Sequence, residues 1–155
     1  MRDPVLIGRM IRIHRRVLSR MIAHARRAYP VECCGLLSGR EGLIERSHEA
    51  SNEKASPREF QIPVRELFDF FLHFRSAGRE HLGIYHSHPR TPPVPSRRDV
   101  LGFHYPGVSY WIVSLEGEEP RVGCYRWCGN GFRKTPFDEA DHAGRGWATN
   151  PQVVE

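Results

Sequence analysis

Two histidines and one aspartate in a short stretch are the residues of this sequence best suited to hold a metal ion. His86 and His88 are separated by a single residue, and Asp99 follows after the proline-rich segment Pro89–Pro95. Alternate residues of a strand point to the same side, so the two imidazoles can face one point. Proline is already restricted in the unfolded chain, so this segment can bend back with little loss of entropy. Asp99 is then expected in the first turn of a short helix, as a third ligand.

The chemistry of these three side chains favours zinc. Two imidazoles and one carboxylate suit a tetrahedral Zn²⁺ whose fourth position is open to water, the layout of a catalytic rather than a structural site. Zinc lowers the pKa of its bound water to about 7, and the reaction then needs a proton acceptor. Glu32 is the candidate, because it begins an apolar strand where a carboxylate is out of place unless it has a role.

Each of these signals also has an ordinary structural explanation. An isolated His-x-His pair on a strand is more often not a pair of ligands. Ser96 and Asp99 fit a helix N-cap and its capping-box-like partner, and Glu32 alone fits an exposed strand end. A capped helix start is compatible with a metal site, since it fixes Asp99 in place. The joint occurrence of these residues, in this order, favours the metal site.

Three segments resemble the JAMM motif of MPN-domain metalloproteases. They are Glu32 with Cys34-Gly35-Leu36-Leu37, then His86-x-His88-Pro89, then Ser96-x-x-Asp99. The resemblance covers roughly Arg9 to Pro136. In length, the chain is similar to the small prokaryotic members of the family. The resemblance implies Zn²⁺ at His86, His88 and Asp99, Glu32 as general acid/base, and Ser96 as a hydrogen-bond partner of the water or the oxyanion. The motif is intact, which disfavours the inactive MPN relatives that lack ligands.

The same resemblance implies a fold, a reaction and a partner. The fold is a single MPN-type domain with a mostly antiparallel curved sheet flanked by helices, similar in architecture to cytidine deaminases. The reaction is hydrolysis of the bond after the C-terminal Gly-Gly of a ubiquitin-like or sulfur-carrier protein. Whether that bond is an isopeptide, a linear peptide or a single amino-acid adduct stays open. The alternative is a non-catalytic MPN scaffold that binds a ubiquitin-like partner. Small members of the family often self-associate, which leaves a homodimer open.

The hydrophobic pattern predicts a mixed α/β domain over residues 9–136. Helices are expected at Arg16–Ala28, from Pro63 to before Gly78, and at Ser96–Gly102. From residue 137 to 155 the chain is polar, and a loose tail is expected there. Strands are expected at Met10–Ile13, Glu32–Ser38, Gly42–His48, His81–Ser87, Val108–Leu115 and Val122–Trp127.

Composition excludes several other classes of protein. The 155 residues are 39% hydrophobic and 26% charged, as in one globular domain, and no apolar run is long enough to cross a membrane. No signal peptide is evident at the N-terminus, so a cytoplasmic protein is expected. The net charge of +5 is compatible with nucleic-acid binding or a nuclease. No helix-turn-helix or aromatic RNA-binding pattern supports such a partner. The four cysteines are expected to be buried thiols.

The remaining expectations concern the substrate groove. An extended Gly-Gly tail is expected to pair with an exposed strand edge across the zinc. The segments Ser51–Gln61 and Phe103–Val108 are expected to form the walls of this groove. Tyr110 and Trp111 are expected in the core, and Phe60 is expected to be a packing anchor.

Overall fold

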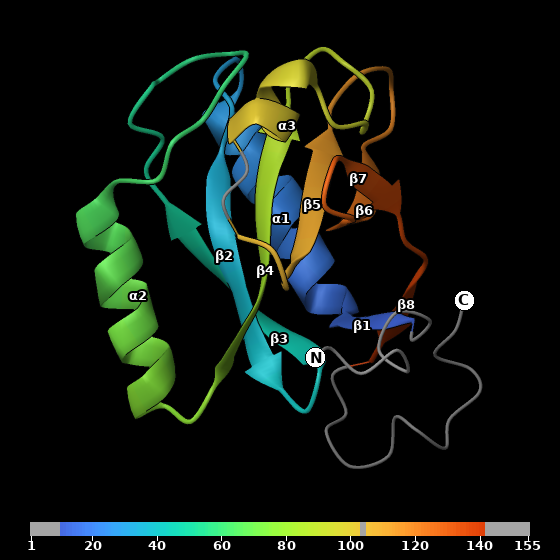
Figure 1. The fold of residues 1–155 in the computed structure, drawn as a ribbon. Helices are drawn as coiled ribbons and strands as arrows, with labels where there is room; N and C mark the ends of the chain where they lie inside the picture. The colour runs from blue at the N-terminus through green and yellow to red at the C-terminus, as the bar shows by residue number, and fades with distance from the viewer. Residues whose placement is uncertain (1–9, 103–104, 142–155) are drawn as a thin grey trace.

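A single mixed sheet runs through the protein in the computed structural model, which describes residues 10–102 and 105–141 (Figure 1). The elements, in chain order, are β1 (Ile11–His14), α1 (Arg15–Ala28), β2 (Cys34–Arg40), β3 (Leu43–Ala50), α2 (Val64–Ser76), β4 (Glu80–His88), α3 (Arg97–Gly102), β5 (Ser109–Ser114), β6 (Arg121–Trp127), β7 (Phe132–Lys134) and β8 (Phe137–Ala140). No helix in the described ranges is long and apolar enough to cross a membrane.

The eight strands lie in the order β7-β6-β5-β4-β2-β3-β1-β8. Strand β4 is antiparallel to β2 and parallel to β5, so it has a neighbour on each side. The other antiparallel pairs are β2–β3, β5–β6 and β6–β7, and β1 runs parallel to both β3 and β8. The expected mixed α/β fold, with a curved sheet in which antiparallel pairs outnumber parallel ones, is confirmed.

Alternating residues divide the core between the two faces of the sheet. Helix α1 packs on one face, where Val17 and Met21 join Leu37, Tyr85 and Trp111 in a buried cluster. Figure 1 shows α1 behind the sheet and α2 on its left. The opposite face carries a second cluster, in which Leu36, Ile84, Tyr110 and Ile112 meet Phe74 of α2. From Ile84 onward the even-numbered residues of β4, including His86 and His88, therefore lie on the α2 face.

Helix α2 covers that face only in part. Phe74 is buried, whereas Val64, Phe68, Phe71 and Leu72 are exposed, with relative accessibilities of 39–76%. These four residues follow helical spacing, so they form one apolar stripe on the outer side of α2. We call this set the α2 stripe.

A glycine in β2 is required by close packing around it. A Cβ atom at Gly35 would lie 2.4 Å from the carbonyl oxygen of His48 and 2.5 Å from the ring of Tyr85. Any side chain at this position would therefore push β2 away from β3 and β4. Since β4 carries both histidines, Gly35 contributes to the position of the site.

Two expectations about the C-terminal part are corrected by the structure. The loose tail was expected from residue 137, but Phe137–Ala140 forms β8, which pairs with β1. Strand β7 was not expected either. Both strands are too short to show a clear alternation of polar and apolar residues. They form because they pair with neighbouring strands, which the local sequence does not reveal. Residues 142–155, the rest of the expected tail, lie outside the described residues. Among the cysteines, Cys128 is exposed and the other three are buried.

Candidate metal centre

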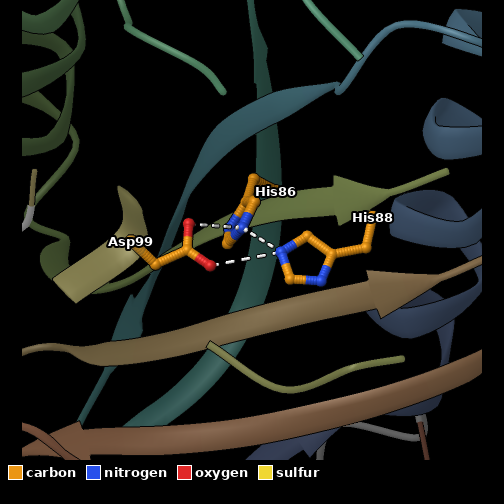
Figure 2. A group of neighbouring side chains, drawn as sticks. All are labelled: His86, His88 and Asp99. Atoms are coloured by element: carbon orange, nitrogen blue, oxygen red, sulfur yellow. Dashed lines mark hydrogen bonds and ion pairs between the residues drawn. The ribbon is translucent and has the colours of Figure 1, made fainter. Parts of the chain in front are cut away.

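Three side chains from two elements converge on one point, as expected from the sequence (Figure 2). The Nε2 atoms of His86 and His88 lie 3.1 Å apart. Asp99 Oδ1 is 3.0 Å from His86 Nε2, and Asp99 Oδ2 is 3.2 Å from His88 Nε2. The histidines come from the end of β4, and Asp99 comes from the first turn of α3. All three residues are buried, with relative accessibilities of 0%, 3% and 7%.

The surroundings orient these donor atoms. His88 Nδ1 lies 2.8 Å from the carbonyl oxygen of Pro92, which can only accept a hydrogen bond. In the neutral ring Nδ1 must therefore carry the proton, and the Nε2 lone pair faces the other two residues. Asp99 Oδ2 accepts a hydrogen bond from the Ser96 amide at 2.7 Å, and Oδ1 accepts one from the Tyr110 hydroxyl at 3.1 Å.

The geometry and charge of the three residues fit a metal ion. Two ligands at about 2.0–2.1 Å from a tetrahedral Zn²⁺ are separated by about 3.3–3.4 Å, close to the observed 3.0–3.2 Å. Burial opposes ionisation of Asp99, but the two imidazoles and the Ser96 amide outweigh it and hold the pKa of Asp99 well below its usual range. The Asp99 carboxylate therefore stays ionised although it is buried. Together with the two imidazoles it forms a set of ligands suited to a divalent cation.

Glu32 lies beside this centre, two residues before β2 begins. It lines one cavity together with His88 and Ser96. The residue is 3% exposed, and its Oε1 atom is buried without a hydrogen-bond partner among the described residues. Burial raises the pKa of Glu32 to about 8. The Cys33 amide next to it donates to Ser87 Oγ at 2.8 Å, which ties the Glu32 segment to β4.

Ser96 adopts the helix-capping arrangement that its spacing from Asp99 predicted. Its Oγ accepts a hydrogen bond from the Asp99 amide at 3.1 Å, while its own amide donates to the Asp99 carboxylate. The structural and the functional interpretation of Ser96 are therefore compatible. The hydroxyl still has its own hydrogen to donate, and the side chain lines the Glu32 cavity.

Asn52 organises the loop beside Glu32 and was missed in the sequence analysis. Its Nδ2 donates to the carbonyl oxygens of Glu32 and Glu59, both at 3.0 Å. Its Oδ1 accepts from the amides of Lys54 at 3.0 Å and Gln61 at 3.1 Å. One side chain thus joins the Glu32 segment to both ends of the loop. An asparagine in a polar loop gives no signal of this role, because its partners depend on how the loop folds.

Two aromatic residues also contribute more than expected. Tyr110 was expected in the core and is buried there, yet its hydroxyl contacts Asp99. Phe60 was expected to be a packing anchor, and its ring stacks on His86 with centroids 4.6 Å apart. The parallel register pairs Ile84 of β4 with Tyr110 of β5, which places Tyr110 on the same face as His86.

Two cavities flank the three ligands. The first, of about 450 Å³, reaches Asp99 and is walled by apolar and aromatic residues, among them Phe60, Leu67 and Tyr110. The two segments that were expected to form the walls of the substrate groove also line this cavity. Lys54 represents Ser51–Gln61, and Tyr105 represents Phe103–Val108. Phe103 and His104, also in the second segment, lie outside the described residues. We call this cavity the apolar cavity. The second is the cavity that contains Glu32.

A curved mixed sheet that holds two histidines and an aspartate beside a buried glutamate defines a domain with a candidate metal centre. The chain belongs to the prokaryotic homologs of the JAB domain, whose family model matches residues 14–127. This confirms the resemblance to the JAMM/MPN group.

Relatives with known names support the assignment as a hydrolase. The chain is 34% identical over 121 residues to a desampylase of Haloferax volcanii, covering 74% of this chain and 85% of the relative. It is 36% identical over 100 residues to a CysO-cysteine peptidase of Mycobacterium tuberculosis, covering 63% and 68%. The solution structure of protein DSY2949 from Desulfitobacterium hafniense has a TM-score of 0.79 at 34% identity, covering 86% of this chain and 94% of that one. The expectation of a hydrolytic enzyme is confirmed.

Proposed function

We propose that this chain is a zinc-dependent peptidase or isopeptidase that cleaves after the C-terminal Gly-Gly of a ubiquitin-like or sulfur-carrier protein in the cytoplasm. The observation that carries the proposal is the convergence of His86, His88 and Asp99 beside Glu32, whose Oε1 atom has no hydrogen-bond partner among the described residues. Peptidase relatives, one of which is named for a bond between CysO and cysteine, support a protein substrate. The intact ligand set disfavours the alternative of a non-catalytic scaffold.

The protein's own residues would carry the protons of this reaction. Zinc, when bound by the three ligands, supplies Lewis-acid chemistry that makes water a nucleophile at neutral pH. Glu32 takes a proton from the attacking water and later gives one to the leaving amine, for which a pKa near the working pH is favourable. Ser96 donates its hydroxyl hydrogen to the oxyanion, and Tyr110 keeps Asp99 oriented. Asn52 holds the Glu32 main chain in place.

The apolar cavity is where we place the Gly-Gly tail. Its approach to the ligands is bordered by Phe60, stacked on His86, which favours glycine over larger residues. The expectation that the tail pairs with an exposed strand edge is not supported at β4, which has strands on both sides. The tail would instead contact the loop that contains Phe60. Val64 belongs both to this cavity and to the α2 stripe, so an apolar patch on the globular part of the partner can dock there.

The metal assignment is tested by elemental analysis of purified protein. Wild type should hold about one zinc per chain, and His86→Ala, His88→Ala and Asp99→Ala should each lose most of it. His81→Ala is the matched control, since His81 lies on the same strand but bonds to the Gly83 carbonyl. Full zinc content in all three ligand variants would show that the assignment is wrong.

The substrate is tested with a ubiquitin-like protein from the same genome that ends in Gly-Gly and carries a short C-terminal extension. Cleavage should occur directly after the second glycine and should stop when that glycine is replaced by valine. Equal cleavage of both forms, or no cleavage of either, would refute the proposed substrate. The molar mass of the complex, measured in the same experiment, distinguishes docking of the partner on the α2 stripe from formation of a homodimer through it.

A further inference from the structure

The cavity that contains Glu32 is strongly basic. It has a volume of about 490 Å³, and its lining includes Arg58, Arg90, Arg97 and Arg98. Among the described residues, Glu32 is the only acidic one in that lining. The apolar cavity on the other side of the ligands instead combines aromatic and aliphatic walls with charges of both signs. The two sides of the metal centre therefore differ in the chemistry that they can accept.

The four arginines differ in how far their charge is already balanced. Arg98 forms an ion pair with Glu59 at 3.7 Å. Arg90 lies over the ring of Tyr29, 5.9 Å from its centroid, and donates to the Tyr29 hydroxyl at 3.3 Å. Arg58 and Arg97 have no acidic partner within ion-pair distance in residues 10–102 and 105–141. Both are exposed, so their guanidinium groups are available to an anion that enters the cavity.

The position of Glu32 decides which half of the substrate enters this cavity. Glu32 is assigned the transfer of a proton to the leaving amine, so that amine must lie on the side of Glu32. When the amine is the α-amino group of an amino acid, a carboxylate follows one carbon away. When it is the side-chain amine of a lysine, four methylene groups follow instead. Arginine binds a carboxylate through paired charge-assisted hydrogen bonds, and it gains nothing from methylene groups.

We propose that this basic cavity is a subsite for the α-carboxylate of a single amino acid attached after the Gly-Gly, with Arg58 and Arg97 as its specificity-determining residues. This inference rests on the proposed function and narrows it to one of the three bond types. Hydrolysis breaks the C–N bond between glycine and that amino acid. The water oxygen remains on the glycine carboxylate, and the water proton passes through Glu32 to the departing amino group.

The preference for a single attached amino acid follows from the groups that other substrates would place against Arg58 and Arg97. A longer peptide extension has an amide where the carboxylate would be, and a lysine isopeptide has an alkyl chain. The amide offers one neutral carbonyl oxygen as an acceptor and the alkyl chain offers none, so neither replaces the paired charge-assisted hydrogen bonds of a carboxylate. We expect kcat/KM for the carboxylate substrate to exceed that for the corresponding amide by at least about tenfold, which is about 1.4 kcal/mol.

The test uses the zinc-loaded enzyme and one Gly-Gly-ending carrier protein from the same genome, prepared in three forms. One form carries a C-terminal alanine with a free carboxylate, the second carries alanine amide, and the third carries lysine amide joined through its side-chain amine. Wild type is compared with Arg58→Gln/Arg97→Gln and with the Arg58→Lys/Arg97→Lys variant. The matched control, Arg20→Gln/Arg40→Gln, removes the same charge from exposed residues that line neither cavity. Affinity of the Glu32→Gln protein for the three forms, measured without turnover, gives a second readout.

The expected result is a carboxylate-to-amide ratio of at least about ten in wild type and in the control. The ratio should fall to about one in the double glutamine variant and recover in part in the lysine variant. The binding affinities should follow the same order. Equal rates for the three forms in wild type, or an unchanged ratio in the double glutamine variant, would overturn this inference and leave the proposed function intact. If none of the three forms is cleaved, the proposed function itself fails.

Discussion

Replacing Glu32 by glutamine is expected to stabilise the metal-free protein at neutral pH while removing most of its activity. Glu32 is buried, one of its carboxylate oxygens has no hydrogen-bond partner among the described residues, and its pKa rises from 4.5 to about 8 on folding. Between these two values the carboxyl is ionised in the unfolded chain and protonated in the folded one. The free energy of unfolding therefore falls as pH rises through this interval.

The size of the effect follows from the raised pKa. Each pH unit between about 4.5 and about 8 lowers the free energy of unfolding by up to about 1.4 kcal/mol. Glu32 lines an open cavity, so solvent reduces this value, and we expect a cost of about 1–3 kcal/mol at pH 7. Glutamine does not titrate and avoids this cost. For a domain of this size the melting temperature of the metal-free variant should exceed that of wild type by about 2–10 °C.

The assay is thermal unfolding of both metal-free proteins from pH 5 to pH 8. The pH dependence of the difference is the test, because the burial of the neutral amide costs the same at every pH. Glu118→Gln, a substitution of the same type at an exposed residue between β5 and β6, is the control. With zinc bound, the nearby cation favours the carboxylate, so the gain should shrink. A difference that stays constant or decreases from pH 5 to pH 8 would refute the reasoning.

Four other outcomes are expected. Glu32→Gln should keep its zinc, measured by elemental analysis, and lose at least about 10²-fold in turnover of the Gly-Gly substrate; normal turnover would contradict its role. Tyr110→Phe should weaken zinc affinity in a chelator competition by about 10–100-fold, because Asp99 loses a hydrogen-bond donor; unchanged affinity would exclude a positioning role. Asn52→Ala should lower kcat by about tenfold or more without removing zinc, because the Glu32 main chain loses its support; wild-type kcat would argue against this. Burial lowers the pKa of His48 to about 4, so the stability that the neutral imidazole contributes is fully present above about pH 6.5 and is lost as the pH falls toward 4. In denaturant titrations at several pH values, His48→Phe should make the free energy of unfolding depend less on pH in this interval. An equally steep dependence in the variant would refute this role of His48.

The sequence by itself determined most of the candidate metal centre. The single-residue spacing of His86 and His88 fixes both side chains on one side of a strand, whatever that strand pairs with. The capping relation between Ser96 and Asp99 is local too, and the structure contains it. Helix α1 and the longer strands could be predicted because their apolar residues repeat with the period of the element. These features depend on residues close together in the chain, which is why sequence patterns reveal them.

Tertiary structure alone decided the parts that depend on distant partners. Tyr110 reaches Asp99 because β5 pairs with β4 in one particular parallel register, and a shift by one residue would turn its side chain to the other face. Strand β8 exists because β1, far away in the sequence, offers it a free edge. Arg58 and Arg97 meet in one cavity because a loop and a short helix fold against the same end of β4. Contacts of this kind leave no periodic trace in the sequence, since their energy comes from packing between segments rather than from order within one.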